Sequence, residues 1–308
     1  MKNIFNYFSY IFVIVSLYFV IRHLNNQNLL VIPNSINTAN LLLSVLFLLI
    51  GFMFNCLSWK SILRSNGINA TMVDSVRSIG ISIMGKYIPG KVWLITGMSG
   101  TISQATGSSF IEVTYVATLL QLIIISIGAC VGVSALFPII GIWYISFIYS
   151  IIVLTVVVLL VQKKRLILFL EKLKNTLTEK WLLPIIRCMD LRLFLYILGI
   201  WLSWSLGFYF LCASVGLEYH NLWMGFSFAL ASSVGILVVF APGGLGVREG
   251  LLGLLLSRFG LKASSVASIA TFSRLWFFAG ELMIFIVALL IALTLWLKHK
   301  RRMHNTIV

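Results

Sequence analysis

Long apolar stretches alternate with short polar ones along the whole chain. An apolar helix needs about 20 residues to cross the hydrocarbon core of a membrane. Six stretches are about that long: 4–21, 41–59, 112–134, 139–161, 193–214 and 270–297. The longest polar stretch, 162–192, has the length of a loop rather than of a soluble domain. The pattern therefore predicts an all-α polytopic membrane protein in which residues 1–308 form a single integral membrane domain.

The composition agrees with that pattern and excludes the soluble globular class. Hydrophobic residues make up 60% of the 308 residues, charged residues make up 10%, and the mean hydropathy is +1.04. The first apolar stretch follows Lys2, as in a signal peptide. Its aromatic bulk and its lack of a small-residue cleavage site nevertheless favour a retained helix.

The residues that usually carry catalysis or bind metals are few and scattered. The four cysteines include no Cys-x-x-Cys pair, and the histidines fall at the ends of apolar stretches or in the tail. No nucleophile motif, metal-spaced histidines, paired aspartates or phosphate-binding loop is present. We therefore expect no metal, no cofactor and no enzymatic activity.

Basic residues predict the orientation of the chain. The segment 163–192, named the basic loop here, carries eight Lys or Arg, and residues 298–302 add four more. Because cytoplasmic segments are enriched in these residues, we place the basic loop and both termini in the cytoplasm. The net charge of +15 then indicates attraction to anionic lipid headgroups rather than to nucleic acid, since the charges flank apolar stretches and no nucleic-acid-binding module is present.

Two glycine-rich motifs occur about half a chain apart: YIPGKVWLITGMSG begins at Tyr87 and FAPGGLGVREG begins at Phe240. Both fit the pattern Pro-Gly, six residues, Gly, two residues, Gly. The matching positions are Pro89, Gly90, Gly97 and Gly100 in the first copy and Pro242, Gly243, Gly250 and Gly253 in the second, offset by 242 − 89 = 153 residues. The same offset aligns the apolar stretches on either side. We infer two internal repeats, 41–134 and 193–290.

The repeat predicts how the segments cross the membrane. If each motif is the tip of a re-entrant hairpin, whose two short helices enter and leave on the same side, six full spans remain. The first hairpin, about 72–108, then enters from the cytoplasm and the second, about 222–262, from outside, so the repeat is inverted. An alternative has eight spans, with 222–240 and 249–268 both crossing, but the second of these would hold two basic residues in the membrane.

Proline and glycine suit the tips of such hairpins. Proline cannot continue the hydrogen bonding of the helix before it, and glycine permits positive φ and close packing. The helices that restart after the tips would present free N–H groups and positive dipole ends to an anion such as a phosphate. The residues expected at the tips are Pro89, Gly90, Pro242, Gly243, Gly244 and Gly246. Plain tight turns between helices are the alternative.

Charged residues near the tips and in the last span are the candidates for a site, because an ionisable group at membrane depth is costly. The expected lipid-headgroup-binding residues are Arg77, Lys86, Lys91, Arg248 and Arg274, and the expected gating or proton-coupling residues are Glu249 and Glu281. Glu281 follows Arg274 by two helical turns on nearly the same face. The alternatives are a static ion pair that fixes helix packing for Glu281, and for Glu249 a charge at a helix start or a partner of Arg248.

At these residues the chain resembles the transmembrane region of lysylphosphatidylglycerol synthase, the multiple peptide resistance factor family of flippase-like proteins. The resemblance rests on YIPGKVW (87–93), APGGLGVREG (241–250) and TFSRLWFFAGE (271–281) and covers roughly 40–290. It implies a prokaryotic plasma membrane protein that moves a lipid between leaflets, with aminoacyl transfer carried by a separate soluble domain. Since the sequence ends at Val308, we expect that domain to be absent.

Two functions follow as hypotheses. The first is translocation of a phospholipid or lipid-linked glycan, whose anionic headgroup passes a polar cavity between the two tips; uncoupled scrambling and proton-coupled transport both fit it. Moving a headgroup through hydrocarbon is costly because its polar groups lose water, and charged partners lower that cost. The second is a membrane scaffold for a separately encoded cytoplasmic glycosyltransferase or aminoacyltransferase, docked on the basic loop 163–192.

Overall fold

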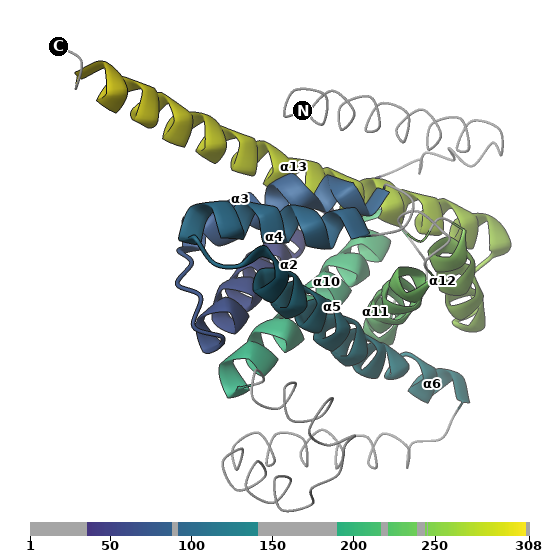
Figure 1. Ribbon diagram of the computed structural model, residues 1–308. Coiled ribbons are helices and arrows are strands. Elements are labelled where there is room, and N and C mark those ends of the chain that lie inside the picture. The colour runs from purple at the N-terminus through teal and green to yellow at the C-terminus, as the bar shows by residue number, and fades with distance from the viewer. Residues whose placement is uncertain are drawn as a thin grey trace, which may run out of the picture.

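The structure is a computed structural model that describes residues 36–87, 92–140, 190–216, 221–238, Gly244 and 246–305. Every regular element within these ranges is a helix, which confirms the predicted all-α class for them (Figure 1). The predicted stretches 4–21 and 139–161 and the basic loop lie wholly or largely outside the described residues. The same holds for Pro89, Gly90, Lys91, Pro242 and Gly243.

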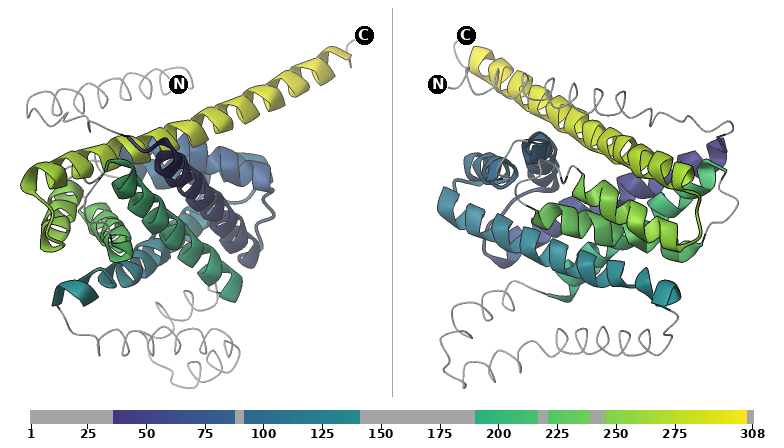
Figure 2. Two further views of the ribbon diagram at one scale, coloured as in Figure 1. Left: turned by 180° about the vertical axis from the view of Figure 1, so that it is seen from behind. Right: turned by 90° about the vertical axis from the view of Figure 1, so that its right-hand side faces the viewer.

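Four long helices match predicted apolar stretches. They are α2 (Thr38–Ser65), α5 (Phe110–Val133), α10 (Leu191–Ser214) and α13 (Ala263–Asn305), with the short α6 (Leu136–Ile140) directly after α5. By length and composition, four described segments can cross a membrane: Thr38–Ser65, Phe110–Ile139, Leu191–Ser214 and Ala263–Leu297. The described chain is therefore consistent with a polytopic membrane protein. α13 runs along one side of the other helices and its C-terminal part projects beyond them (Figure 2).

Four shorter helices follow one another in two pairs. The first pair is α3 (Met72–Ser82) and α4 (Val92–Thr106), joined through the 3-10 helix η1 (Ile83–Tyr87), and the second is α11 (Leu222–Leu237) and α12 (Val247–Arg258). The longest of the four, α11, has 16 residues, and at about 1.5 Å per residue it spans roughly 24 Å, less than a hydrocarbon core of about 30 Å. Within each pair the two helices pack on each other.

The eight-span alternative needs a continuous helix over 249–268, and the structure has none there. α12 ends at Arg258, and the chain turns through Gly260, whose φ is +83°, before α13 begins at Ala263. Glycine is favoured at that turn because other residues rarely adopt positive φ. The chain thus breaks into two helices where that alternative places one crossing.

The helices and their packing correspond under the offset of 153 residues. α2 and α10 begin at Thr38 and Leu191, and α5 and α13 begin at Phe110 and Ala263; both pairs of starts differ by 153. The packed pairs correspond too: α3 packs on α13 as α11 packs on α5, and α4 packs on α5 as α12 packs on α13. α2 and α10, which are each other's counterparts, pack together. The first helix of each short pair therefore lies against the long helix of the other half, and the second helix lies against the long helix of its own half.

Polar side chains cap the N-terminal ends of three helices. Asn37 caps α2, and its side chain accepts a hydrogen bond from the N–H of Asn40 at 3.1 Å. Thr71 and Asp74 form a reciprocal capping box at the start of α3. Asp190 caps α10 through the N–H of Leu193 at 2.7 Å. Such caps satisfy N–H groups that the first helical turn leaves unpaired.

Buried tryptophans tie the long helices together. The indole N–H of Trp201 on α10 donates to the carbonyl of Ile124 on α5 at 2.8 Å, and that of Trp204 donates to Leu48 on α2 at 3.3 Å. A side chain at Gly51 would collide with the Trp204 ring, so the close approach of α2 and α10 requires glycine there. These contacts join α2, α5 and α10 into the framework on which the hairpins lie.

Candidate functional site

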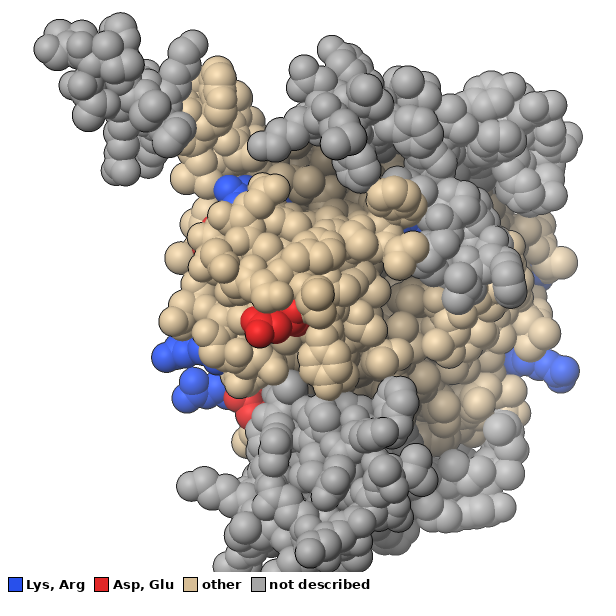
Figure 3. All heavy atoms as spheres, in the orientation of Figure 1, with Lys and Arg blue, Asp and Glu red and all other residues tan. Residues whose placement is uncertain are grey.

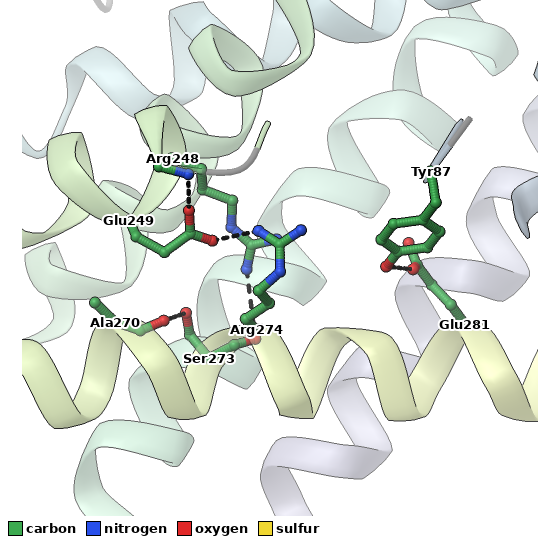
Figure 4. A network of polar contacts seen from close by, with 8 residues as sticks. Tyr87, Arg248, Glu249, Ala270, Ser273, Arg274 and Glu281 are labelled. Carbon is green, nitrogen blue, oxygen red and sulfur yellow. Dashed lines mark hydrogen bonds and ion pairs between the residues drawn. The ribbon is translucent and has the colours of Figure 1, made fainter. Parts of the chain in front are cut away.

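Charged side chains from both hairpins meet along one face of α13. The charged cluster comprises Lys86 from η1, Arg248 and Glu249 from α12, and Arg274 and Glu281 from α13, and Tyr87 lies beside it. Figure 4 labels Tyr87, Arg248, Glu249, Arg274 and Glu281. The face of the molecule seen in Figure 3 is mostly uncharged, with its Lys and Arg mainly at the margins. Each hairpin is thus joined to α13 by an ion pair.

The first ion pair of the cluster joins the two halves of the chain. The Lys86 ammonium contacts one carboxylate oxygen of Glu281, and the Tyr87 hydroxyl donates to the other oxygen at 2.6 Å. Glu281 is fully buried, whereas 24% of the Lys86 side chain is exposed. Because both oxygens are satisfied, the buried carboxylate is tolerated in this position. Glu281 thus pairs with Lys86 from the first hairpin, and its pairing is not with Arg274, the residue with which the sequence associated it.

The second ion pair holds the start of α12 against α13. Arg274 Nη1 lies 2.6 Å from one carboxylate oxygen of Glu249, and the other oxygen accepts the backbone N–H of Gly246 at 2.8 Å. Gly246 has a φ of +81°, a conformation that favours glycine. Glu249 thus caps the start of α12, which was one alternative for this residue. The other alternative, a partner of Arg248, is wrong, because Glu249 pairs with Arg274.

Arg248 is the basic residue of the cluster that pairs with no carboxylate among the described residues. Its guanidinium lies beside two aromatic rings that contact each other, 4.7 Å from the centroid of Phe228 and 5.3 Å from that of Phe277. Only 8% of the residue is exposed. Nη2 donates a long hydrogen bond of 3.4 Å to the Ser273 carbonyl, and the buried Nε–H meets no acceptor in the described part of the chain.

Phe277 connects the two tips. Its ring contacts the Lys86 ammonium at 5.0 Å as well as Arg248, so cations from both hairpins lie over one aromatic side chain of α13. Three basic and two acidic side chains therefore share a small, largely buried region, and one positive charge remains after both ion pairs are counted. An excess charge of this kind attracts an anion.

The position of the proton within one ion pair does not change the charge of the cluster. The Lys86–Glu281 pair is neutral whether its proton lies on the ammonium or on the carboxyl. The excess positive charge of the cluster therefore does not depend on the proton position in that pair.

Not every residue predicted for the site lies in it. Arg77, on α3, is half-buried, and no described contact joins it to the charged cluster, although its Nε has no hydrogen-bond partner among the described residues. Lys91 lies outside the described residues. Gly244 has a φ of +73°, and a Cβ on it would lie 3.0 Å from the Gly235 carbonyl oxygen, so the backbone requires glycine at this position.

Sequence reasoning missed the aromatic part of the site. Phe277 lies midway between Ser273 and Glu281 at steps of four residues, so its position on the same helix face could have been recognised. Tyr87 directly follows Lys86 in the first motif and is a hydroxyl donor within a hydrophobic segment. No comparable signal marks Phe228, because its contact with Arg248 joins two helices whose relative placement depends on the fold.

The comparisons with known proteins give one match. A family model described as the lysylphosphatidylglycerol synthase TM region matches residues 6–280. This range includes both glycine-rich motifs and every residue of the charged cluster except Glu281, which lies directly after it. Neither a curated protein nor a solved structure matches the chain.

Proposed function

The chain belongs to the lysylphosphatidylglycerol synthase TM region family, and on that premise we propose that it moves a lipid between the two leaflets of a membrane. The observation that carries this proposal is Arg248, a buried cation without a carboxylate partner among the described residues. Burying an unpaired cation is costly, and an anionic lipid headgroup would supply the missing partner. The lipid's acyl chains would remain in the bilayer while its headgroup occupies the charged cluster.

The short hairpins give the headgroup a route. We propose that α3–α4 and α11–α12 are re-entrant and enter from opposite sides, so that their tips meet at the charged cluster within the membrane. Helices of 11 to 16 residues fit this role better than full crossings. Broken helices are tolerated inside a membrane where their free backbone groups line protein or a wet site. A headgroup could then reach the cluster from either leaflet as one tip or the other moves aside.

The two ion pairs are suited to act as gates. A phosphate that binds Arg248 can also displace the Glu249 carboxylate from Arg274. These two side chains form an ion pair at 2.6 Å. The displaced carboxylate then loses its partner and gains affinity for a proton. Glu281 would respond in the same way if the headgroup reached Lys86. Exchangeable pairs of this kind lower the cost of carrying a charged headgroup through a medium of low dielectric constant.

The scaffold hypothesis rests on the basic loop 163–192, which lies almost entirely outside the described residues. No contact in the described residues favours a docked cytoplasmic transferase. We therefore carry forward translocation of a phospholipid or lipid-linked glycan as the proposed function.

Reconstitution tests the proposal directly. The purified chain is placed in vesicles that contain a fluorescently labelled phospholipid, and the fraction of label accessible to a membrane-impermeant quencher is followed over time. We expect faster exchange than in protein-free vesicles, and a rate at least about tenfold lower for Glu249→Gln, because an amide cannot return as a charged partner for Arg274. Equal exchange in all three preparations would refute translocation.

A further inference from the structure

We infer that Arg77 on α3 forms a second phosphate-binding site, outside the charged cluster, at which the first hairpin holds the phosphate group of a membrane lipid. The inference rests on the proposed function where it places this site on the route of the lipid, because the phosphate would bind Arg77 before or after it occupies the cluster. Three observations support it: the missing partner of Arg77, the exposed apolar side chains around it, and its position along α13.

Arg77 is a cation without a partner in the described part of the chain. Its side chain is half-buried, and its Nε–H is buried without a hydrogen-bond acceptor. The nearest carboxylate in sequence, that of Asp74, bonds to Thr71 instead: its Oδ2 accepts the backbone N–H of Thr71 at 3.0 Å and the hydroxyl at 2.6 Å. A buried donor without an acceptor is costly, and a guanidinium binds the oxygens of a phosphate with two parallel hydrogen bonds. A phosphate would therefore stabilise Arg77.

Exposed apolar side chains flank Arg77 on the surface of α3. Val73 precedes it by four residues and Ile81 follows it by four, so all three lie on one side of the helix. Val73 is 46% exposed and Ile81 is 37% exposed. In a membrane-embedded hairpin such side chains contact acyl chains, and a cation among acyl chains is costly unless an anion accompanies it. A lipid meets both needs, because its chains cover Val73 and Ile81 while its phosphate accepts hydrogen bonds from Arg77.

The position of Arg77 along α13 separates it from the charged cluster. Gly80 lies about one turn after Arg77, and a Cβ on it would lie 2.6 Å from the Ile284 carbonyl oxygen of α13. Further along the chain, Lys86 contacts Glu281 on α13. Arg77 precedes Lys86 by 86 − 77 = 9 residues, which corresponds to roughly 15 Å along α3 and η1. A phosphate on Arg77 therefore lies outside the cluster, along the same pair of packed helices.

The second hairpin has no equivalent cation. The offset of 153 residues relates Arg77 to Leu230 on α11, 77 + 153 = 230. Leu230 packs closely on α5, where a Cβ on Gly132 would collide with its backbone. The repeat therefore provides this phosphate site on the first hairpin and a packing contact on the second. Because the first hairpin is proposed to enter from the cytoplasm, the site would take lipid from the cytoplasmic leaflet.

Photolabelling of the full chain in vesicles tests this inference. The vesicles are phosphatidylcholine with a trace of a phosphatidylglycerol whose headgroup carries a diazirine, and mass spectrometry of peptides locates the label after illumination. Ile111 is the reference for contact with bulk lipid, because it is the second residue of α5, as Val73 is of α3, and is 78% exposed. We expect Val73 and Ile81 to carry at least about tenfold more label than Ile111. Equal labelling of the three residues would overturn the inference.

Three variants separate the charge of Arg77 from its packing. Arg77→Gln should lower the label on Val73 at least about tenfold, whereas Arg64→Gln, at the exposed end of α2, should leave it unchanged. Arg77→Lys keeps a cation but cannot donate two parallel hydrogen bonds, so it should retain an intermediate amount of label. Equal loss of label in Arg77→Lys and Arg77→Gln would overturn the inference. If Arg77→Gln failed to fold, the excess of label on Val73 over Ile111 in the wild type would still decide.

Inorganic phosphate distinguishes a lipid from a free anion. Added in excess over the labelled lipid, it should leave the label on Val73 in place, because it has no acyl chains to cover Val73 and Ile81. Loss of the label would overturn a lipid ligand and assign Arg77 to a free phosphate.

Leaflet exchange separates this inference from the proposed function. Label on Val73 that depends on Arg77, in a chain that exchanges no lipid, would refute translocation while supporting the phosphate site. Lipid exchange together with no more label on Val73 than on Ile111 would overturn the phosphate site while supporting translocation.

Discussion

The two halves of the chain share one helical framework but differ in charge at the place where their hairpins lie against the long helices. In the second half, Arg248 and Glu249 begin α12, and Arg274 and Glu281 lie on α13. The corresponding residues of α4 and α5 are Ile95, Thr96, Gln121 and Gly128. The packing is thus alike in both halves, whereas four of the five charged residues of the cluster come from the second half and only Lys86 comes from the first.

Gly128 and Glu281, which correspond under the offset of 153 residues, illustrate this difference between the two halves. A Cβ on Gly128 would collide with the Trp201 ring and the Ser233 hydroxyl, so glycine at this position allows helices to pack. Its counterpart Glu281 is fully buried and pairs with Lys86 and Tyr87. Positions related by the repeat therefore serve the framework in the first half and the charged cluster in the second. Three variants test this distinction, and they follow in order of expected effect.

The largest effect is expected for Glu281→Leu. It leaves the Lys86 ammonium without its carboxylate and the Tyr87 hydroxyl without its acceptor. Removing one member of a buried ion pair lowers the free energy of unfolding by roughly 3–5 kcal/mol. Chemical denaturation of the purified protein in detergent measures this loss. The double variant Lys86→Met with Glu281→Leu should recover most of it, and a single variant as stable as the wild type would contradict the assigned pair.

Gly128→Ala tests the framework side of the comparison. The added methyl group collides with Trp201, and overpacking of this kind costs about 1–3 kcal/mol. Gly100→Ala on α4 is the matched control, because no atom lies within 4 Å of the added Cβ. The same denaturation experiment should show a loss for Gly128→Ala and none for Gly100→Ala. Equal stability of the two variants would argue against the close packing of α5 and α10.

Gly246→Ala tests the backbone at the start of α12. Nothing lies within 4 Å of the added Cβ, but the φ of +81° disfavours any residue other than glycine, at a cost of about 1–2 kcal/mol. Gly250→Ala, inside the same helix with the same open surroundings, should instead gain about 0.5–1 kcal/mol. If Gly246→Ala proved as stable as Gly250→Ala, the left-handed start of α12 would be wrong.

Much of the fold was predictable from hydropathy and the two glycine-rich motifs. The predicted hairpins, 72–108 and 222–262, contain α3–α4 and α11–α12, because short apolar segments broken by proline and glycine have few other arrangements. Helix caps such as Thr71 could be read directly from sequence, since they act over three residues.

The partners within the site were less predictable. The spacing of Arg274 and Glu281 indicated a common helix face, but their partners Glu249 and Lys86 lie 25 and 195 residues away in sequence. Only the packing of α12 and η1 on α13 brings them together. Phe277 was missed because an aromatic residue in an apolar helix usually packs in the core, and its contact with two cations depends on where both tips lie.

The central claim is that the unpaired charge of Arg248 carries a lipid headgroup across the membrane. The most direct measurement compares phosphatidylglycerol exchange in vesicles that contain the wild type, Arg248→Gln or Arg258→Gln at equal amounts of folded protein. Both variants remove one arginine from α12, but only the first removes it from the charged cluster. We predict wild-type exchange for Arg258→Gln and a rate at least about tenfold lower for Arg248→Gln. Equal rates for the two variants would contradict the claim.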